Sequence, residues 1–287
     1  MGEPLTAGPL PVALDVALRA VVLDAVACGG EIAVVVRHLQ RGDRWELNAA
    51  VPFPSASTIK VPVLAALYAA AAEGHARLDQ DVVLRAEDQV TGSGILQVLS
   101  PGVRLPLRDL AELMIVVSDN TATNMILEVV GIDRVNRLLD RLGLTTTRLV
   151  RALQVIPADH QGMNIITAGE YAALFAGLAT GRVVSWEASR RMVATLKRQQ
   201  INDALPALLP AADGGDVALG AFPAWEWAHK TGGLTGVQHD GGLFYVPGHT
   251  VVVTVLTRGC GPGHVARQLI ARIGRAVWEA YGDAANA

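Results

Sequence analysis

The spacing of apolar residues predicts α/β structure at both ends of the chain. Positions 11–28 combine apolar residues with scattered charges and end at a glycine pair, which is typical of an amphipathic helix. The β-branched run 32–39 and the shorter run 44–48, separated by a turn, predict a hairpin. Towards the C-terminus, the pattern predicts three further strands at 225–229, 242–246 and 250–257, and a closing helix at 262–281.

The middle of the chain has a helical pattern instead. It runs from Ser57 to about Pro210, where prolines and a glycine pair mark the return to strands. We therefore predict an α/β (α+β) fold with one five-stranded antiparallel sheet flanked by the terminal helices. An all-helical lobe is inserted between its second and third strands. The predicted boundaries are a single domain at 1–287, with an α/β lobe at about 1–56 and 212–287 and a helical lobe at about 57–211.

Composition and charge exclude several classes of partner. The 287 residues are 51% hydrophobic, which allows a large core, and the net charge of −3 gives no electrostatic case for nucleic acid or an anionic membrane. No apolar run reaches the ~18 residues that a membrane-spanning helix needs. The composition leaves the oligomeric state open.

The N-terminus and the two cysteines bear on the location of the protein. Residues 1–4 lack the basic region of a secretory signal, so we expect a cytoplasmic protein, or an exported one if a leader was removed. Cys28 and Cys260 are far apart in sequence, and could pair if the last strand passes the first helix. We expect free, buried thiols.

The chemistry begins at Ser57-Thr58-Ile59-Lys60, an S-x-x-K tetrapeptide between a proline-rich loop and an apolar helix that has Pro62 in its first turn. Positions i and i+3 share a helix face, so Ser57 Oγ and Lys60 Nζ can meet at the helix N-terminus. A neutral lysine can activate a serine nucleophile if its pKa is depressed. An isolated match is weak, because most such tetrapeptides are solvated helix starts.

Two further motifs follow at element boundaries. Ser118-Asp119-Asn120 precedes a new helix, for which one of the three is the expected N-cap. Lys230-Thr231-Gly232 ends the strand predicted at 225–229, and Gly233 follows it, which allows a ligand to approach the backbone closely. Each motif alone also suits a cap or a turn.

Together and in this order, the three motifs resemble those of the penicillin-recognising serine hydrolases, the class A β-lactamases and their penicillin-binding relatives. The resemblance covers nearly the whole chain. It includes the loop 92–96 and the helical stretches 107–111 and 121–124. It implies a β-lactamase/D,D-peptidase-like fold, a small-molecule substrate and no cofactor or metal.

The resemblance also implies roles for the catalytic residues. Ser57 would be the acylated nucleophile and Lys60 the base, or a group that polarises the base. Ser118 and Lys230 would flank the leaving atom and relay a proton, and two lysines in one cleft repel, which lowers the pKa of one of them.

Substrate-binding roles follow in the same way for Asn120, Thr231, Gly232, Gly233 and Ser93. Lys230 with Thr231 would hold a substrate carboxylate. Asn120 would bind a substrate amide and Lys60. The backbone N–H groups of Ser57 and Gly233 would form the oxyanion hole, with each donor worth about 3 kcal/mol. Asp119 is expected to hold the loop through backbone bonds.

The chain departs from the class A pattern at the glutamate that activates the deacylating water. The segment 147–156 keeps the preceding T-R-L-x-R pattern, but Leu153 stands in the glutamate slot, or Gln154 if the loop shifts by one. Neither can act as a general base. Asp159 and His160 could supply one, although both suit an exposed loop. His239 and Asp240 could line the cleft or form a turn.

The leading hypothesis is therefore a serine hydrolase that is acylated at Ser57 by a β-lactam, amide or ester and turns β-lactams over weakly. The loss of a general base costs roughly 10²–10⁴ in rate. The alternatives are an esterase or D,D-peptidase relative, and a non-catalytic binding module with the same cleft.

Overall fold

The computed structural model describes residues 10–154, 162–211 and 224–282. Its helices are α1 (Val12–Ala27), α2 (Lys60–Ala72), α3 (Leu107–Val116), α4 (Asn120–Val130), α5 (Ile132–Arg141), α6 (Ala168–Ala179), α7 (Trp186–Lys197) and α8 (Gly263–Tyr281). Short 3-10 turns cover Ala56–Ile59, Ala86–Asp88 and Leu96–Val98. None of the helices in these ranges is long and apolar enough to cross a membrane.

The predicted five-stranded antiparallel sheet is confirmed. Its strands are β1 (Glu31–His38), β2 (Arg44–Leu47), β7 (Glu226–Leu234), β8 (Val237–Val246) and β9 (His249–Arg258), in the order β2-β1-β9-β8-β7. The first and last long strands are therefore neighbours, with Glu31 opposite Arg258. Two small sheets that the sequence pattern did not predict pair β3 (Pro52–Pro54) with β6 (Ile165–Thr167), and β4 (Asp81–Val83) with β5 (Arg104–Pro106).

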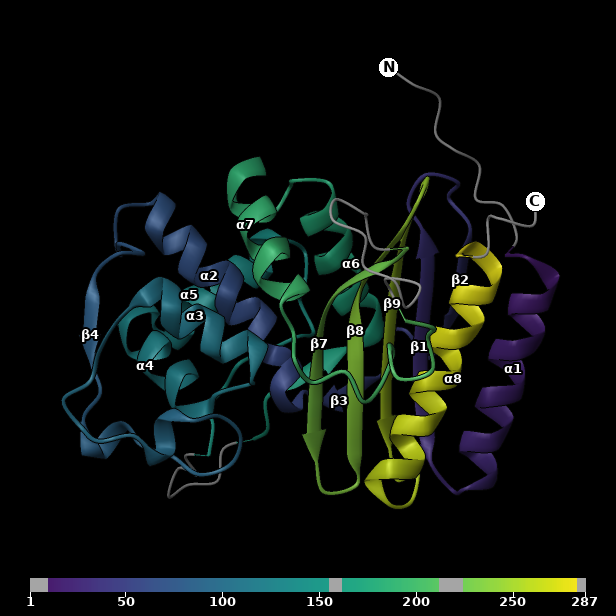
Figure 1. Cartoon of the computed structure of the whole chain (residues 1–287), viewed down its shortest axis with the longest axis horizontal. Coiled ribbons are helices and arrows are strands. Elements are labelled where there is room, and N and C mark those ends of the chain that lie inside the picture. The colour runs from purple at the N-terminus through teal and green to yellow at the C-terminus, as the bar shows by residue number, and fades with distance from the viewer. Residues whose placement is uncertain (1–9, 155–161, 212–223, 283–287) are drawn as a thin grey trace.

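Alternate residues along β1 are buried against different helices on the two faces of the sheet. On β1, Val34 and Val36 pack with α1 and α8, whereas Ala33 and Val35 face the cluster that continues into the helical segment. This is the period-two pattern of a strand that is buried on both sides. Figure 1 shows α8 and α1 on one side of the sheet and the remaining helices on the other.

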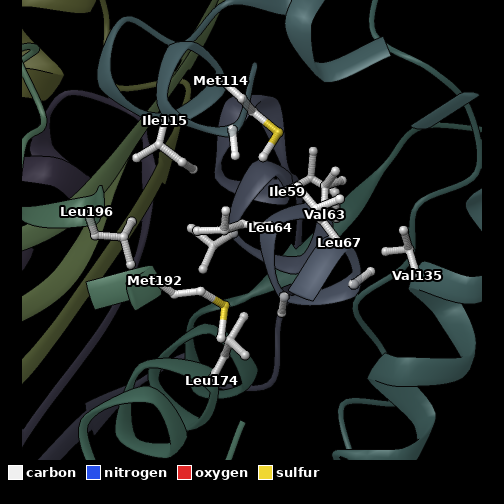
Figure 2. Close-up of a cluster of buried hydrophobic side chains, with 14 of the residues drawn as sticks. Ile59, Val63, Leu64, Leu67, Met114, Ile115, Val135, Leu174, Met192 and Leu196 are labelled. Carbon is white, nitrogen blue, oxygen red and sulfur yellow. The ribbon is translucent and has the colours of Figure 1, made fainter. Parts of the chain in front are cut away.

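The α2 helix is the centre of the helical segment, because nearly all of its residues are buried. Leu64 and Leu67 lie among side chains from neighbouring helices, including Met114 of α3 and Met192 of α7 (Figure 2). A helix that is apolar on all sides is held by packing around its whole circumference. The first turn of α2, which carries Lys60, is therefore held firmly in place.

Two sequence predictions about the strands need correction. The motif Lys230-Thr231-Gly232 lies inside β7 and does not end it, because the strand continues to Leu234 and pairs with β8 throughout. Of the two roles expected for His239 and Asp240, the turn is wrong, because both are buried residues of β8. The other role holds for His239, which lines a cavity together with Ser57.

Both cysteines are free, as expected, but only Cys260 is buried; Cys28 is exposed at the end of α1. The prediction of two buried thiols is therefore wrong for Cys28. Cys260 packs on Gly30, where a Cβ atom would lie 2.3 Å from its Sγ.

Candidate active site

Ser57 lies in the 3-10 turn Ala56–Ile59, and Lys60 begins α2 directly after it. Thr58 fixes this turn, since both its backbone N–H and its hydroxyl donate to Ser55 O. Ala56 has a φ of 45°, in the left-handed region that a residue with a Cβ adopts at a cost. The turn before the serine is therefore strained and held by its surroundings.

Gly232 lets β7 approach this turn. A Cβ atom at Gly232 would lie 3.1 Å from Ser57 N and 3.1 Å from Ala56 Cβ. Only a residue without a side chain allows the strand and the serine turn to lie this close. The glycine of the third motif thus brings the backbone of β7 alongside Ser57.

The second motif forms the junction between α3 and α4. Ser118 has a φ of 56°, and Asp119 is the N-cap of α4, with its Oδ1 accepting from Ala122 N at 2.9 Å. Its Oδ2 accepts from the N–H groups of Ile95 and Leu96 at 2.7 and 2.9 Å. The expectation that Asp119 holds the loop through backbone bonds is confirmed.

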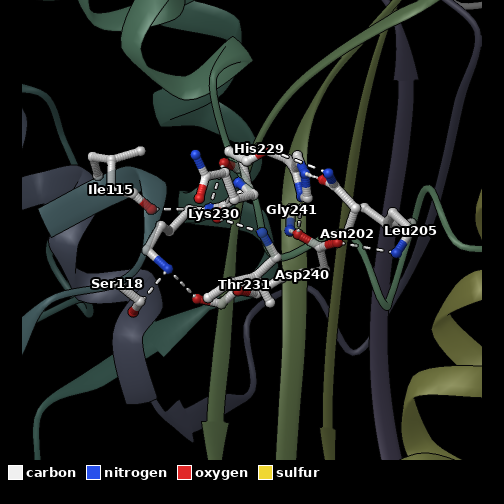
Figure 3. Close-up of polar contacts among 12 residues, drawn as sticks. Ile115, Ser118, Asn202, Leu205, His229, Lys230, Thr231, Asp240 and Gly241 are labelled. Atoms are coloured by element: carbon white, nitrogen blue, oxygen red, sulfur yellow. Dashed lines mark hydrogen bonds and ion pairs between the residues drawn. The ribbon is translucent and has the colours of Figure 1, made fainter. Parts of the chain in front are cut away.

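Two buried lysines meet at the hydroxyl of Ser118. Lys60 Nζ donates to Ser118 O at 2.6 Å, to Ser118 Oγ at 3.0 Å and to Asn120 Oδ1 at 2.9 Å. Lys230 Nζ donates to the same Oγ at 3.1 Å and to Thr231 O at 2.9 Å (Figure 3). Ser57 Oγ is not among the partners of Lys60, so the predicted meeting of these two atoms is replaced here by the contact with Ser118.

Burial changes the proton affinity of both lysines. Desolvation, with the positive charge of Lys230 as a smaller cause, holds the pKa of Lys60 well below its usual value. Desolvation likewise lowers the pKa of Lys230 to about 7, although Asp240 opposes this shift. The predicted repulsion between the lysines is present, but burial is the larger effect. A lysine with a depressed pKa can act as a base near neutral pH.

Ser57 lies between two cavities, and Ser93 and Gly233 also line both. The first, of about 380 Å³, lies against the loop 151–154 and is also lined by Asn120. The second, of about 170 Å³, is lined by Ser118, Thr231 and Gly232 among others. The structure therefore brings all the predicted site residues to one cleft, with the two lysines buried in its wall.

Three charged cleft residues, Arg151, Asp203 and Arg267, were absent from the predicted site residues. Arg267, from the first turns of α8, lines the second cavity and forms an ion pair with Asp203 at 3.0 Å. Arg151 lines the first cavity. Arg267 and Asp203 lie far from the motifs in sequence, and no local pattern marks them.

The loop near the first cavity holds Leu153 by its backbone. Asn124 of α4 accepts from Leu153 N and donates to Leu153 O, both at 2.8 Å. The Leu153 side chain lines the first cavity, beside Ser57. Gln154 follows with a φ of 57°. Asp159 and His160, the candidate replacement bases, lie outside the described residues.

Known proteins resemble this chain in both sequence and structure. Residues 13–281 match the profile described as the Beta-lactamase enzyme family. The Pseudomonas aeruginosa beta-lactamase PSE-4 is 33% identical over 127 residues, which are 44% of this chain and 44% of that protein. The matched segment thus spans less than half the length of this curated relative.

Solved structures match over a longer range. A beta-lactamase from Sphaerobacter thermophilus is 35% identical, with a TM-score of 0.85 over 93% of this chain and 97% of that chain. A leucine-to-glutamate mutant of PBP-A, in an acyl-enzyme complex with penicillin G, is 26% identical, with a TM-score of 0.81 over 98% of this chain and 100% of that chain. The shared fold includes both the sheet and the helical segment.

Proposed function

Because the chain belongs to the beta-lactamase enzyme family of serine hydrolases, we propose that Ser57 accepts the acyl group of a β-lactam, amide or ester and releases a β-lactam acyl group slowly. The observation that carries this proposal is the hydroxyl of Ser118, which lies between two buried lysine nitrogens at 3.0 and 3.1 Å. The cavity lined by this serine also contains Ser57.

Acylation begins with transfer of a proton to Lys60. A neutral Lys60 has two N–H groups, which suit Ser118 O and Asn120 Oδ1, and one lone pair. When this lone pair turns from Ser118 Oγ to Ser57 Oγ, it takes the serine proton as the oxygen attacks the carbonyl carbon. Ser57 and Gly233 line both cavities, and their backbone N–H groups would stabilise the developing oxyanion.

The proton then leaves through Ser118. Its hydroxyl gives a proton to the leaving nitrogen or oxygen and takes one back from Lys60, which ends the step neutral. Lys230 stabilises the Ser118 oxygen during this exchange, because its Nζ donates to that atom. Thr231 and Arg267 line the second cavity, and Lys230 lies buried directly before Thr231 on β7, so this wall would offer donors for a substrate carboxylate.

Slow release follows from the chemistry of the first cavity. Of the described residues that line it, Arg151 alone is charged, and none is a carboxylate. Leu153, fixed by Asn124, has no group that accepts a proton from water. The leucine-to-glutamate mutant of PBP-A, which is titled as a penicillin G acyl-enzyme, supports the proposal that relatives of this fold accept penicillin at the serine.

The test is incubation with penicillin G and, separately, with a chromogenic ester, followed by intact-mass measurement and product release. We expect a stable penicillin adduct on the wild type, no adduct on Ser57→Ala, and slow turnover of the ester. Rapid penicillin turnover would contradict slow release. The absence of both an adduct and ester cleavage would favour a non-catalytic binding module.

A further inference from the structure

A buried polar network lies directly behind Lys230, and the acylation chemistry described above does not use it. His229 precedes Lys230 on β7, so its side chain points to the opposite face of the strand. Its side chain is 1% exposed, and that of Asp240, on the neighbouring strand, is 0% exposed. Buried polar groups of this kind are costly unless every hydrogen-bonding position is used.

Asp240 uses both of its carboxylate oxygens. Its Oδ1 contacts His229 Nδ1 at 2.9 Å and accepts from Gly241 N at 2.9 Å, and its Oδ2 accepts from Leu205 N at 3.0 Å. The carboxylate therefore joins β7 and β8 to the segment that contains Leu205 (Figure 3).

His229 makes a second contact with the same segment. Its Nε2 lies 2.9 Å from Asn202 Oδ1, while Asn202 Nδ2 donates to Gln199 O. Each ring nitrogen thus lies within hydrogen-bond distance of an oxygen, one from the Asp240 carboxylate and one from the Asn202 amide. Gln199 Nε2 also donates to His229 O. The segment 199–205, which has no regular secondary structure, is fastened at each end.

This segment forms part of the cleft. Ile201, Asp203 and Ala204 line the second cavity, where Asp203 also pairs with Arg267. Its first residues are tied to the end of α3, since Gln199 Nε2 donates to Ile115 O. The segment therefore contacts both β7 and the helix that leads to Ser118.

We propose that His229 and Asp240 are a positioning pair, which clamps segment 199–205 onto the sheet and so fixes the wall of the second cavity and the place of Lys230. The catalytic part of this proposal rests on the proposed function; the clamp itself does not. Neither His229 nor Asp240 lines the second cavity. Both would therefore affect the substrate only through the residues that they hold in place.

The pair also affects the charge of Lys230. Among the described residues, two charged groups interact electrostatically with Lys230: the ammonium of Lys60 on α2 and the carboxylate of Asp240 on β8. Asp240 raises the pKa of Lys230, against desolvation. Removal of the carboxylate should therefore move the loss of the Lys230 proton to lower pH, an effect that a purely structural role would not produce.

The clamp is tested by hydrogen exchange on the full-length protein, compared among the wild type, His229→Phe and Asp240→Asn. Both variants should speed exchange in segment 199–205 by about tenfold or more, most of all at the Leu205 amide, because its acceptor is lost or weakened. A matched control is His38→Phe, which removes another buried histidine from the same sheet, one that contacts His249. Unchanged exchange in both variants, or the same change in the control, would overturn the clamp.

Acylation by penicillin G as a function of pH tests the catalytic part. We expect His229→Phe to slow acylation by about 10- to 100-fold, which a displacement of about 1 Å can produce. Asp240→Asn, nearly the same size as the original residue, should in addition shift the alkaline limb of the rate to lower pH. An unshifted limb with a normal rate would overturn the role in acylation. If the wild type forms no adduct while the clamp variants still loosen the segment, the proposed function fails and the clamp stands.

Discussion

The Nζ atoms of Lys60 and Lys230 lie 3.0 and 3.1 Å from one shared oxygen, the Oγ of Ser118. Both lysine side chains are fully buried, so these contacts form where water does not compete. If this oxygen relays the proton to the leaving group, its removal should affect acylation much more than folding.

Ser118→Ala should therefore lower the rate of penicillin acylation by about 10²–10⁴, the usual contribution of a positioned proton donor. The measurement is the rate of adduct formation by quenched-flow mass spectrometry. Ser189→Ala is the matched control, because it removes a buried hydroxyl of α7 that donates to Val183 O, and Ser189 lines neither cavity of the cleft. Equal losses in the two variants would mean that the effect comes from packing.

The pH dependence of acylation should report Lys230. Because the pKa of Lys230 is about 7, its ammonium group is lost as pH rises through this value. Acylation by penicillin G, which carries a carboxylate, should then fall above about pH 7, and acylation by a neutral ester should fall less. If the rate of acylation by penicillin G stays constant from pH 7 to 9, the Lys230 ammonium does not bind the substrate carboxylate.

Lys230→Met should stabilise the protein at neutral pH. The pKa of Lys230 is lowered from 10.5 in the unfolded chain to about 7 in the folded protein. Between these values the unfolded chain binds more protons, so wild-type stability rises with pH. The free energy of unfolding of the variant should exceed that of the wild type by about 1–3 kcal/mol at pH 7.

The stability gained by Lys230→Met should shrink as the pH approaches 10, where the lysine of the unfolded wild-type chain also loses its proton. Urea denaturation at several pH values measures this difference in the free energy of unfolding. Lys197→Met, at a partly exposed lysine paired with Glu226, is the control and should change stability little. A gain that does not vary with pH would show that the burial cost of Lys230 does not come from its charge.

If Leu153 occupies the place of the deacylating glutamate, as the proposed function holds, Leu153→Glu should introduce a general base there. Asn124 binds only the backbone of Leu153, so the side chain can change while the loop keeps its place. Deacylation of the penicillin adduct should accelerate by about 10²–10⁴, as followed by the return of unmodified mass. Gln154→Glu places the same charge one residue later as a control. A gain in that variant alone would show that the deacylating position is shifted by one residue.

The sequence pattern predicted the sheet and the terminal helices because their apolar periods are long and regular. It predicted β7 and β8 too short, because the glycines near Asp240 resemble a turn. The structure shows why glycines stand at positions 241 and 242, inside β8. A Cβ at Gly241 would lie 2.5 Å from Tyr171, and one at Gly242 would lie 2.3 Å from Ala228 O. These glycines make room for close packing inside a strand.

The site was predicted from three short motifs, but its geometry depends on features that no motif contains. The left-handed backbone of Ala56 and Ser118 is imposed by surrounding packing. The contact of His229 with Asn202, and of Arg267 with Asp203, joins residues that are neighbours only after folding. The local preference of a residue for helix, strand or turn cannot predict such long-range contacts.

The position of β9 beside β1 determines when the sheet can form during synthesis of the chain. Arg258 and Glu31, which pair across these strands, are 227 positions apart. The sheet gains its central pairing only after the 227 positions between these residues have left the ribosome, and contacts of such long range slow folding. Until then β7 has no complete sheet to hold it beside Ser57. A nascent chain that ends before β9 should therefore carry the serine and both lysines without acylation activity.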